Sequence, residues 1–156
     1  LLPVMISNAL AGRRLPVYGD GMNVRDWIHV EDHCDALDLV LRHGRSGQTY
    51  NIGADCEIPN ITLVTMLCEI IDQREGPLPS GESHASLIEF VPDRPGHDRR
   101  YAIDFSKLQQ ELGWQPQESF ATGLRKTVSW YVENRNWTDR VRSGEYQKWI
   151  DEQYGG

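Results

Sequence analysis

Apolar side chains recur every three or four residues in five parts of the chain, which is the period of a helix with one buried face. The helices predicted from this pattern span residues 2–11, 36–44, 60–71, 106–112 and 120–132. Gly12 and Gly113 follow two of these runs and favour a helix end at each position. Asn60 is a candidate cap for the third helix, and Ser106 with Gln109 matches a capping box for the fourth.

Shorter apolar runs predict strands at residues 15–18, 26–30, 48–52, 87–91 and 101–103. A glycine-flanked turn, Gly19-Asp20-Gly21, closes the first of them. Residues 75–86, with several glycines and prolines, are predicted to form a surface loop rather than a domain boundary. Helices mixed with short strands indicate an α/β fold with mixed α+β character, without the regular alternation of a complete nucleotide-binding fold. We therefore expect residues 1–156 to form a single domain.

The tail of the chain is polar but carries aromatic and apolar residues at intervals. They are Trp137, Val141, Tyr146, Trp149 and Ile150. We expect this tail to be helical and to pack on the body through its aromatic side chains. The other tryptophans are likewise interpreted as packing residues.

Composition narrows the class of protein. The formal net charge is −7, the hydrophobic content is 39% and the charged content is 25%, values typical of a soluble globular protein. No apolar run approaches the roughly 20 residues of a membrane span, so we expect no membrane partner. The isoelectric point near 5.2, without an extended basic stripe, argues against nucleic acid.

The cysteines indicate the cellular compartment, and the first residues indicate whether the chain is part of a longer protein. The three cysteines are odd in number and lack C-x-x-C spacing, which indicates neither a disulfide framework nor a zinc site. The cytoplasm is therefore the expected compartment. The chain begins at Leu1 in the middle of a helical pattern and without an initiator methionine, as a piece of a longer protein would.

One loop concentrates cations in an otherwise acidic chain. Residues 93–104, D-R-P-G-H-D-R-R-Y-A-I-D, place four basic side chains within seven positions, namely Arg94, His97, Arg99 and Arg100. Arginine offers planar donors that suit phosphate, and Pro95 with Gly96 bends the loop so that these donors can be aimed. The alternative is a set of ordinary surface ion pairs with aspartates of the same loop, namely Asp93, Asp98 and Asp104.

The residues for oxidoreductase chemistry are not in this sequence. No G-x-G-x-x-G turn follows a predicted strand, although a dinucleotide pyrophosphate requires glycines of that kind. No tyrosine has a lysine four residues later, as the acid/base pair of a short-chain dehydrogenase requires. Serine-nucleophile and H-E-x-x-H patterns are also missing. We therefore predict no catalytic residue, no metal and no bound cofactor for this chain.

Five segments nevertheless share a collinear order with a known family. They are P-V-Y-G-D-G at 16–21, R-D-W-I-H-V-E-D-H at 25–33, Y-N-I-G at 50–53, D-R-P-G-H-D-R-R-Y-A-I-D at 93–104 and L-G-W at 112–114. Together they resemble the C-terminal half of the dTDP-glucose 4,6-dehydratases, which are extended short-chain dehydrogenases. The first three segments resemble the wider sugar-nucleotide superfamily, and the basic loop resembles these dehydratases in particular.

The resemblance implies a site for the nucleoside diphosphate of a dTDP-sugar. The matching positions are Pro16, Tyr18, Arg25, Asn60, Arg94, His97 and Tyr146. By this resemblance Pro16 and Tyr18 line the nucleotide pocket. The residues that surround the ribose and diphosphate are Arg25, Asn60, Arg94 and His97. It also implies that the parent enzyme uses NAD, and that its NAD-binding Rossmann domain and catalytic residues belong upstream of Leu1. The chain would then be inactive alone.

Each of these positions also has a purely structural interpretation. Tyr18 and Tyr146 would be buried aromatics, and Asn60 would be only a helix cap. Arg25 would form an ion pair with Asp32 or Asp35. His29 and His33 are interpreted as structural residues, because no metal partners stand at ligand spacing.

Two other functions stay open at this level. The chain could be a non-catalytic module that binds a nucleotide or a protein, or part of a UDP-sugar epimerase or decarboxylase, which should lack the R-P-G-H-D-R-R loop. Self-association is a further expectation, because the first helix would expose an apolar face if it normally packs on a Rossmann core. That face comprises Leu2, Met5, Ile6, Ala9 and Leu10, together with the predicted strand that ends at Ile52.

Overall fold

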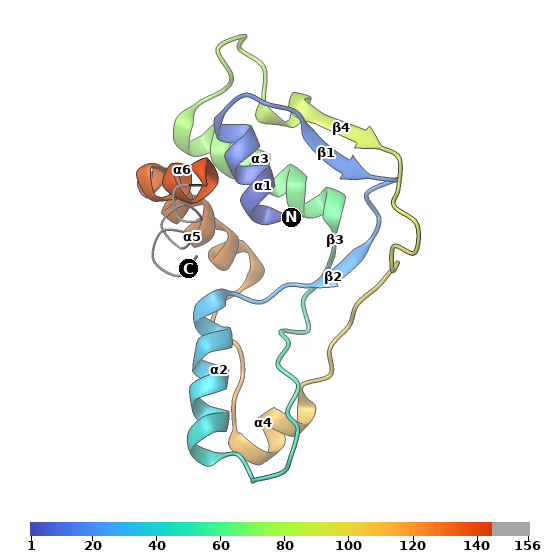
Figure 1. Ribbon diagram of the computed structural model, residues 1–156, viewed down its shortest axis with the longest axis vertical. Helices are drawn as coiled ribbons and strands as arrows, with labels where there is room; N and C mark the ends of the chain where they lie inside the picture. The colour runs from blue at the N-terminus through green and yellow to red at the C-terminus, as the bar shows by residue number, and fades with distance from the viewer. Residues whose placement is uncertain (145–156) are drawn as a thin grey trace, which may run out of the picture.

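The computed structural model describes residues 1–144, and its helices gather into two lobes (Figure 1). The upper lobe contains α1 (Leu2–Leu10), α3 (Asn60–Glu75), α5 (Phe120–Glu133), α6 (Arg135–Ser143) and the strands β1 (Leu15–Tyr18) and β4 (Ile88–Val91). The lower lobe contains α2 (Val30–His43) and α4 (Ser106–Leu112). Two further strands lie between the lobes, β2 (Val24–Asp26) and β3 (Glu57–Pro59). A short 3-10 helix, η1 (His84–Leu87), leads into β4.

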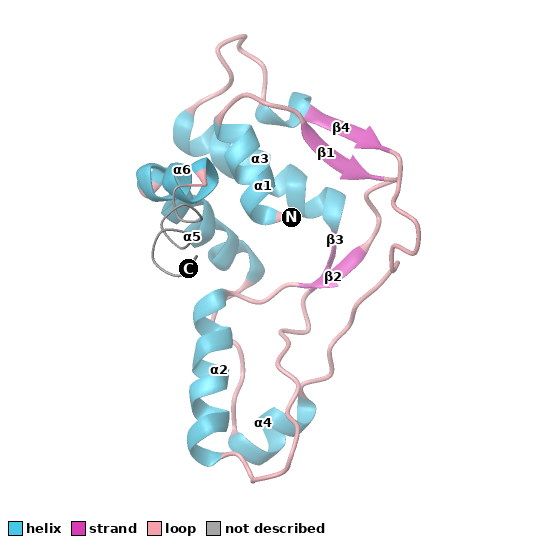
Figure 2. Ribbon diagram, viewed as in Figure 1, coloured by secondary structure: helices cyan, strands magenta, loops and turns pink. Residues whose placement is uncertain are grey.

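The strands form two separate two-stranded sheets (Figure 2). β1 and β4 run parallel, with Leu15 opposite Ile88 and Tyr18 opposite Val91. Parallel strands need a crossover, and here the crossover includes α2 and α3. β2 and β3 run antiparallel, with Arg25 opposite Ile58. The fold is thus mixed α/β, as the sequence predicted.

The main core fills the upper lobe. α3 contributes more residues to this core than any other element, because its apolar residues recur at helical spacing. They are Leu63, Val64, Leu67, Cys68, Ile70 and Ile71. α1 packs against α3 through Met5, Ile6 and Ala9, which are 0–2% exposed. The predicted bare apolar face of α1 is therefore wrong, since α3, β1 and α5 of the same chain contact this helix. The structure therefore gives no support to the dimer that was expected to cover that face.

The lower lobe holds a much smaller cluster, formed by Ala36, Leu108 and Trp114. Phe105 meets Trp114 edge to face, with ring centroids 5.6 Å apart. Gly113 ends α4 with φ +72°, in the left-handed region that favours glycine. This helix end agrees with the sequence prediction.

Three predicted strands are wrong in place or in kind. The strand expected at 26–30 lies at 24–26, and residue 30 already belongs to α2. Residues 48–52 and 101–103 form no strand, and β3 at 57–59 was missed. Tyr50 and Ile52 instead pack against the lower cluster. A strand requires a backbone partner, and no described residue provides one along 48–52.

The predicted side-chain caps are also wrong. Asn60 is the first residue of α3, and the N-cap is Pro59. Ser106 likewise lies inside α4, where its N–H donates to the Asp104 Oδ1 at 2.9 Å. In the tail, α6 carries Trp137 and Val141, whereas Tyr146, Trp149 and Ile150 lie outside the described residues. No helix in residues 1–144 is long and apolar enough to span a membrane.

Candidate functional site

The candidate site begins at the end of β1, where the turn that follows this strand packs against the first turn of α3. Gly19 and Gly21 have φ of +56° and +73°. A Cβ at Gly21 would lie 2.7 Å from the Ile61 Cβ, so this position requires glycine. The Ile61 N–H donates to the Gly21 carbonyl at 2.9 Å, and the Asn60 N–H donates to the Asn23 carbonyl at 3.0 Å. These bonds fix the turn beside the positive end of the α3 dipole.

Two arginines of the basic loop anchor it to the body through ion pairs. Arg99 donates to both carboxylate oxygens of Asp20, at 2.8 and 3.0 Å, and this contact lowers the pKa of Asp20 to about 2. Arg100 binds Glu57 of β3 and lowers the pKa of that carboxyl. The surface ion-pair interpretation is thus correct for these two arginines, although their partners lie outside the loop.

The third basic residue, His97, brings the loop against β1. Its side chain is only 6% exposed, and its Nδ1 lies 2.6 Å from the Asp93 Oδ1. The hydrogen bond from His97 lowers the pKa of the Asp93 carboxyl. The His97 ring meets the Tyr18 ring edge to face, with centroids 6.0 Å apart. Tyr18 itself is 48% exposed, which contradicts its interpretation as a buried aromatic.

Arg25 reaches the same loop from β2. Its guanidinium donates to the carbonyls of Val24 at 2.6 Å and Asp98 at 3.0 Å, and it lies 4.4 Å from the centre of the Tyr101 ring. The alternative interpretation, an ion pair of Arg25 with Asp32 or Asp35, is wrong. Asp32 is buried and accepts the N–H groups of residues 117 and 118 instead.

Arg94 is the fourth cation, and its surroundings differ from those of the other three. Its side chain is exposed and forms no ion pair with any described residue. A hydrogen bond to Asp98 raises the pKa of the Tyr101 hydroxyl, while the charges of Arg25 and Arg94 act against this rise. Both guanidinium groups therefore lie within electrostatic reach of one hydroxyl. An unpaired arginine beside a fixed one can bind a phosphate group.

Two more positions complete the described part of the site. Asn60, at the start of α3, has a buried side-chain oxygen without a hydrogen-bond partner among the described residues. Pro16 and Tyr18 alternate with the buried Leu15 and Val17 along β1, so they share the outer face of this strand. Tyr146 lies beyond the described residues.

Comparison of the sequence with known protein families identifies the family of this chain. A family model described as GDP-mannose 4,6 dehydratase matches residues 1–127. The chain belongs to this family. Among its curated members, the dTDP-glucose 4,6-dehydratase of Shigella flexneri is 51% identical over 156 residues, which are 100% of this chain and 42% of that protein. The dTDP-glucose 4,6-dehydratase of Xanthomonas campestris pv. campestris is 51% identical over 147 residues, covering 94% of this chain and 42% of that protein.

Solved structures of the dehydratase family have the same fold. The Bacillus anthracis dTDP-glucose 4,6-dehydratase, in complex with NAD, superposes with a TM-score of 0.76 at 46% identity, over 88% of this chain and 40% of that one. The Streptomyces venezuelae dehydratase DesIV, with NAD and TYD bound, gives 0.78 at 45% identity, over 88% and 39%. A Thermotoga maritima UDP-glucose 4-epimerase gives 0.70 at 26%, over 83% and 38%. The chain spans about two fifths of the length of these relatives.

Several residues that organise this dehydratase-family site were missed from the sequence. Asp20 and Glu57 hold the arginines of the loop, and Tyr101 supports Arg25. Asp26 accepts the N–H groups of residues 54 and 56, at 3.1 and 2.9 Å. Asp26 and Asp32 both belong to the R-D-W-I-H-V-E-D-H segment that was singled out in the sequence. The segment alone does not indicate which backbone groups they bind.

Proposed function

We propose that this chain binds the nucleoside diphosphate of a dTDP-sugar, as the sugar-nucleotide-binding part of a dTDP-glucose 4,6-dehydratase. The carrying observation is the convergence of Tyr18, Arg25 and Arg94 around one loop, with Arg94 unpaired among the described residues. The identities of 45–51% to dehydratases, against 26% to the epimerase, favour this substrate class over UDP-sugars. The basic loop supports the same choice.

Each residue has a role that its surroundings suit. Tyr18 and Pro16 would contact the base, because they lie on the outer face of β1. Arg25 and Arg94 would bind the diphosphate through charge-assisted hydrogen bonds. The unpaired oxygen of Asn60 would accept a hydrogen bond from a ribose hydroxyl. His97, held by Asp93, would keep Tyr18 in place.

The residues of this chain do not fit NAD. Gly19 and Gly21 follow β1, but the chain then enters β2 rather than a helix, so this turn is not the strand–turn–helix unit that binds a dinucleotide pyrophosphate. No tyrosine and lysine stand four residues apart in the sequence. The hydride and proton transfers of the parent enzyme, from dTDP-glucose to its 4-keto-6-deoxy product, would therefore depend on residues from another part of the enzyme. We expect this chain alone to release no such product.

The decisive experiment is calorimetric titration of the chain with dTDP. Arg94→Ala should weaken dTDP binding by about tenfold or more, because a charge-assisted hydrogen bond contributes about 1.5 to 3 kcal/mol. Arg42→Ala removes the same charge from α2, where Arg42 pairs with Asp38, and should leave the affinity within about twofold. UDP and GDP, titrated in parallel, report the base preference. Absence of dTDP binding, or equal affinity in Arg25→Ala, Arg94→Ala and the parent chain, would contradict the proposal.

A further inference from the structure

A cavity of about 950 Å³ opens between the start of α1, the segment that joins β2 to α2, and α5. None of the described residues proposed to bind the sugar nucleotide lines it. Its wall includes five aromatic side chains, those of Trp27, Phe120, Trp130, Tyr131 and Trp137. The Trp130 ring meets the rings of Tyr131 and Trp137 edge to face, with centroids 5.3 and 5.1 Å away. Its volume suits a small organic molecule.

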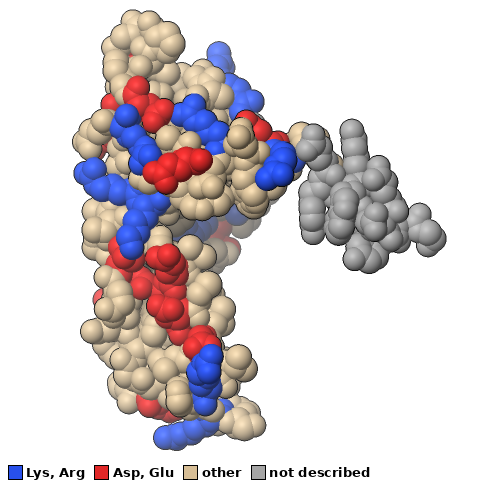
Figure 3. Space-filling model, turned by 90° about the vertical axis from the view of Figure 1, so that its left-hand side faces the viewer, with Lys and Arg blue, Asp and Glu red and all other residues tan. Residues whose placement is uncertain are grey.

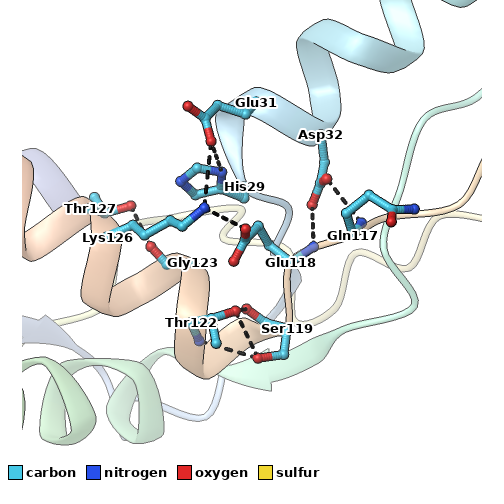
Figure 4. A network of polar contacts seen from close by, with 10 residues as sticks. All are labelled: His29, Glu31, Asp32, Gln117, Glu118, Ser119, Thr122, Gly123, Lys126 and Thr127. Carbon is cyan, nitrogen blue, oxygen red and sulfur yellow. Dashed lines mark hydrogen bonds and ion pairs between the residues drawn. The ribbon is translucent and has the colours of Figure 1, made fainter.

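One polar atom in this wall is buried without a partner. The His29 side chain is 8% exposed, and its Nδ1 forms no hydrogen bond with any described residue. The Glu31 Oε2 lies 3.7 Å from this nitrogen (Figure 4). Gly123 lets the ring lie against α5, because a Cβ there would come 3.3 Å from the His29 Cβ. A buried nitrogen that accepts no hydrogen bond is costly, so a donor from a ligand would be favoured here.

The polar side of the cavity carries more negative than positive charge. Lys126 binds Glu118 at 2.5 Å and lies 3.8 Å from Glu31, which leaves one carboxylate in excess. Figure 4 shows the two carboxylates on either side of the lysine. Figure 3 shows a band of acidic side chains along the middle of one face of the molecule, with basic side chains above and below it. An anionic ligand would be repelled by this wall, and a cation would be attracted.

We propose that this cavity binds a small organic cation with an aromatic body, with its ammonium group between His29 Nδ1 and Glu31 and its ring against the tryptophans. Ammonium groups bind favourably over the electron-rich faces of tryptophan and tyrosine, and they donate hydrogen bonds to carboxylate and imidazole acceptors. The same pocket offers a neutral molecule no charge contact. This inference is independent of dTDP binding, because the two sets of described residues do not overlap.

Three probes with one ring and different charges test the proposal: phenethylammonium, phenethyl alcohol and phenylacetate. Two-dimensional NMR of the indole N–H groups follows binding at Trp27, Trp130 and Trp137. Phenethylammonium should shift these signals with the highest affinity, phenethyl alcohol should bind more weakly, and phenylacetate most weakly. Equal affinity for phenylacetate and phenethylammonium, no shift with any probe at about 10 mM, or shifts confined to residues outside the cavity would overturn the proposal.

Two variants separate the charge from the fold. Glu31→Gln, at a side chain that is 71% exposed, should weaken phenethylammonium binding about three- to tenfold and leave phenethyl alcohol unchanged. Glu82→Gln removes the same charge from the loop at 76–83, which does not line the cavity, and should change neither affinity. Both variants should keep the amide dispersion of the parent chain. An unchanged affinity for phenethylammonium in Glu31→Gln would also overturn the proposal.

Discussion

The two lobes differ in how they are held together. Within the described part of the chain, thirteen buried residues from α1, β1, α3 and α5 form one continuous core in the upper lobe. The lower cluster contains three, Ala36, Leu108 and Trp114. On its other side, α2 leaves three apolar side chains 51–85% exposed, namely Val30, Leu37 and Leu41. Packing therefore stabilises the upper lobe far more than the lower one.

Polar contacts compensate in part in the lower lobe and in the segments that lead to it. Asp32 of α2 holds two backbone N–H groups of the segment that runs from α4 to α5. Asp26 holds two backbone N–H groups of the segment that returns to β3. Stability need not be uniform along such a chain, and the lower lobe should open first. Pro16, Tyr18 and Asn60 of the candidate site lie in β1 and at the start of α3, which belong to the more stable upper lobe.

The largest effect is expected in the upper core. Leu67 of α3 is fully buried, so Leu67→Ala should lower the free energy of unfolding by about 2 to 5 kcal/mol, through lost burial and the cavity left behind. Urea denaturation followed by circular dichroism measures this change. Leu41→Ala, at a side chain that is 85% exposed, is the matched control and should cost less than about 0.5 kcal/mol. Similar losses in both variants would contradict the assigned core.

A smaller and more local effect is expected from Leu108→Ala in the lower lobe. We expect a loss of about 2 kcal/mol, because this small cluster can relax around the missing side chain. Hydrogen exchange should quicken in α2 and α4 while α3 keeps its protection. Equal acceleration in α3 would mean that the two lobes unfold as one cooperative unit.

The contact of α2 with the segment before α5 should contribute less again. Asp32→Asn keeps the size of the side chain but offers one acceptor oxygen to two N–H groups, so we expect a loss of about 1 to 2 kcal/mol. Exchange of the amides of Gln117 and Glu118 should increase in this variant. Asp38→Asn on the exposed face of α2 is the control, and its exchange pattern should match that of the parent chain. Unchanged protection of both amides in Asp32→Asn would show that Asp32 does not hold this segment.

The smallest effect concerns the loop that links β4 to α4 and its ion pair between Arg99 and Asp20. Arg99 lowers the pKa of Asp20 from 3.8 to about 2. A depressed carboxyl pKa in the folded state means that the pair stabilises the loop above pH 3.8 and that this contribution is lost as the pH falls towards 2. NMR titration should place the Asp20 midpoint near 2, and Arg99→Gln should return it towards 3.8. A midpoint unaffected by Arg99→Gln would exclude the pair in solution.

The spacing of apolar residues predicted most of the helices, because this spacing depends only on residues that are close together in the sequence. The run from Leu63 to Ile71 has one apolar face wherever it packs, and Gly113 permits a left-handed helix end without help from other segments. The motif segments likewise marked Tyr18, Arg25 and the basic loop as parts of one site, through their resemblance to a family. In the structure the Tyr18 ring contacts His97 of this loop, and the Arg25 guanidinium contacts Tyr101 of the same loop.

Pairing could not be predicted in the same way, since the partner lies far along the chain. Residues 48–52 have the composition of a strand but no ladder among the described residues, and β3 was missed because only its register with Arg25 makes it a strand. The alternative to phosphate binding for Arg99 and Arg100 was pairing with aspartates of their own loop. In the structure they pair with Asp20 and Glu57 instead. The structural alternative for Arg25 was an ion pair with an aspartate of α2, whereas its guanidinium lies over the Tyr101 ring.

The sequence by itself determined the helices, the glycine turn after β1 and the family to which the motifs belong. The tertiary structure alone decided that α1 is covered by α3, that Arg94 stays unpaired among the described residues while its neighbours do not, and that His29 is buried beside an aromatic cavity. The physical reason is the sequence distance over which each kind of interaction acts. Backbone preferences and helical periodicity act over a few residues, whereas burial and ion pairing depend on which distant segments the folded chain brings into contact.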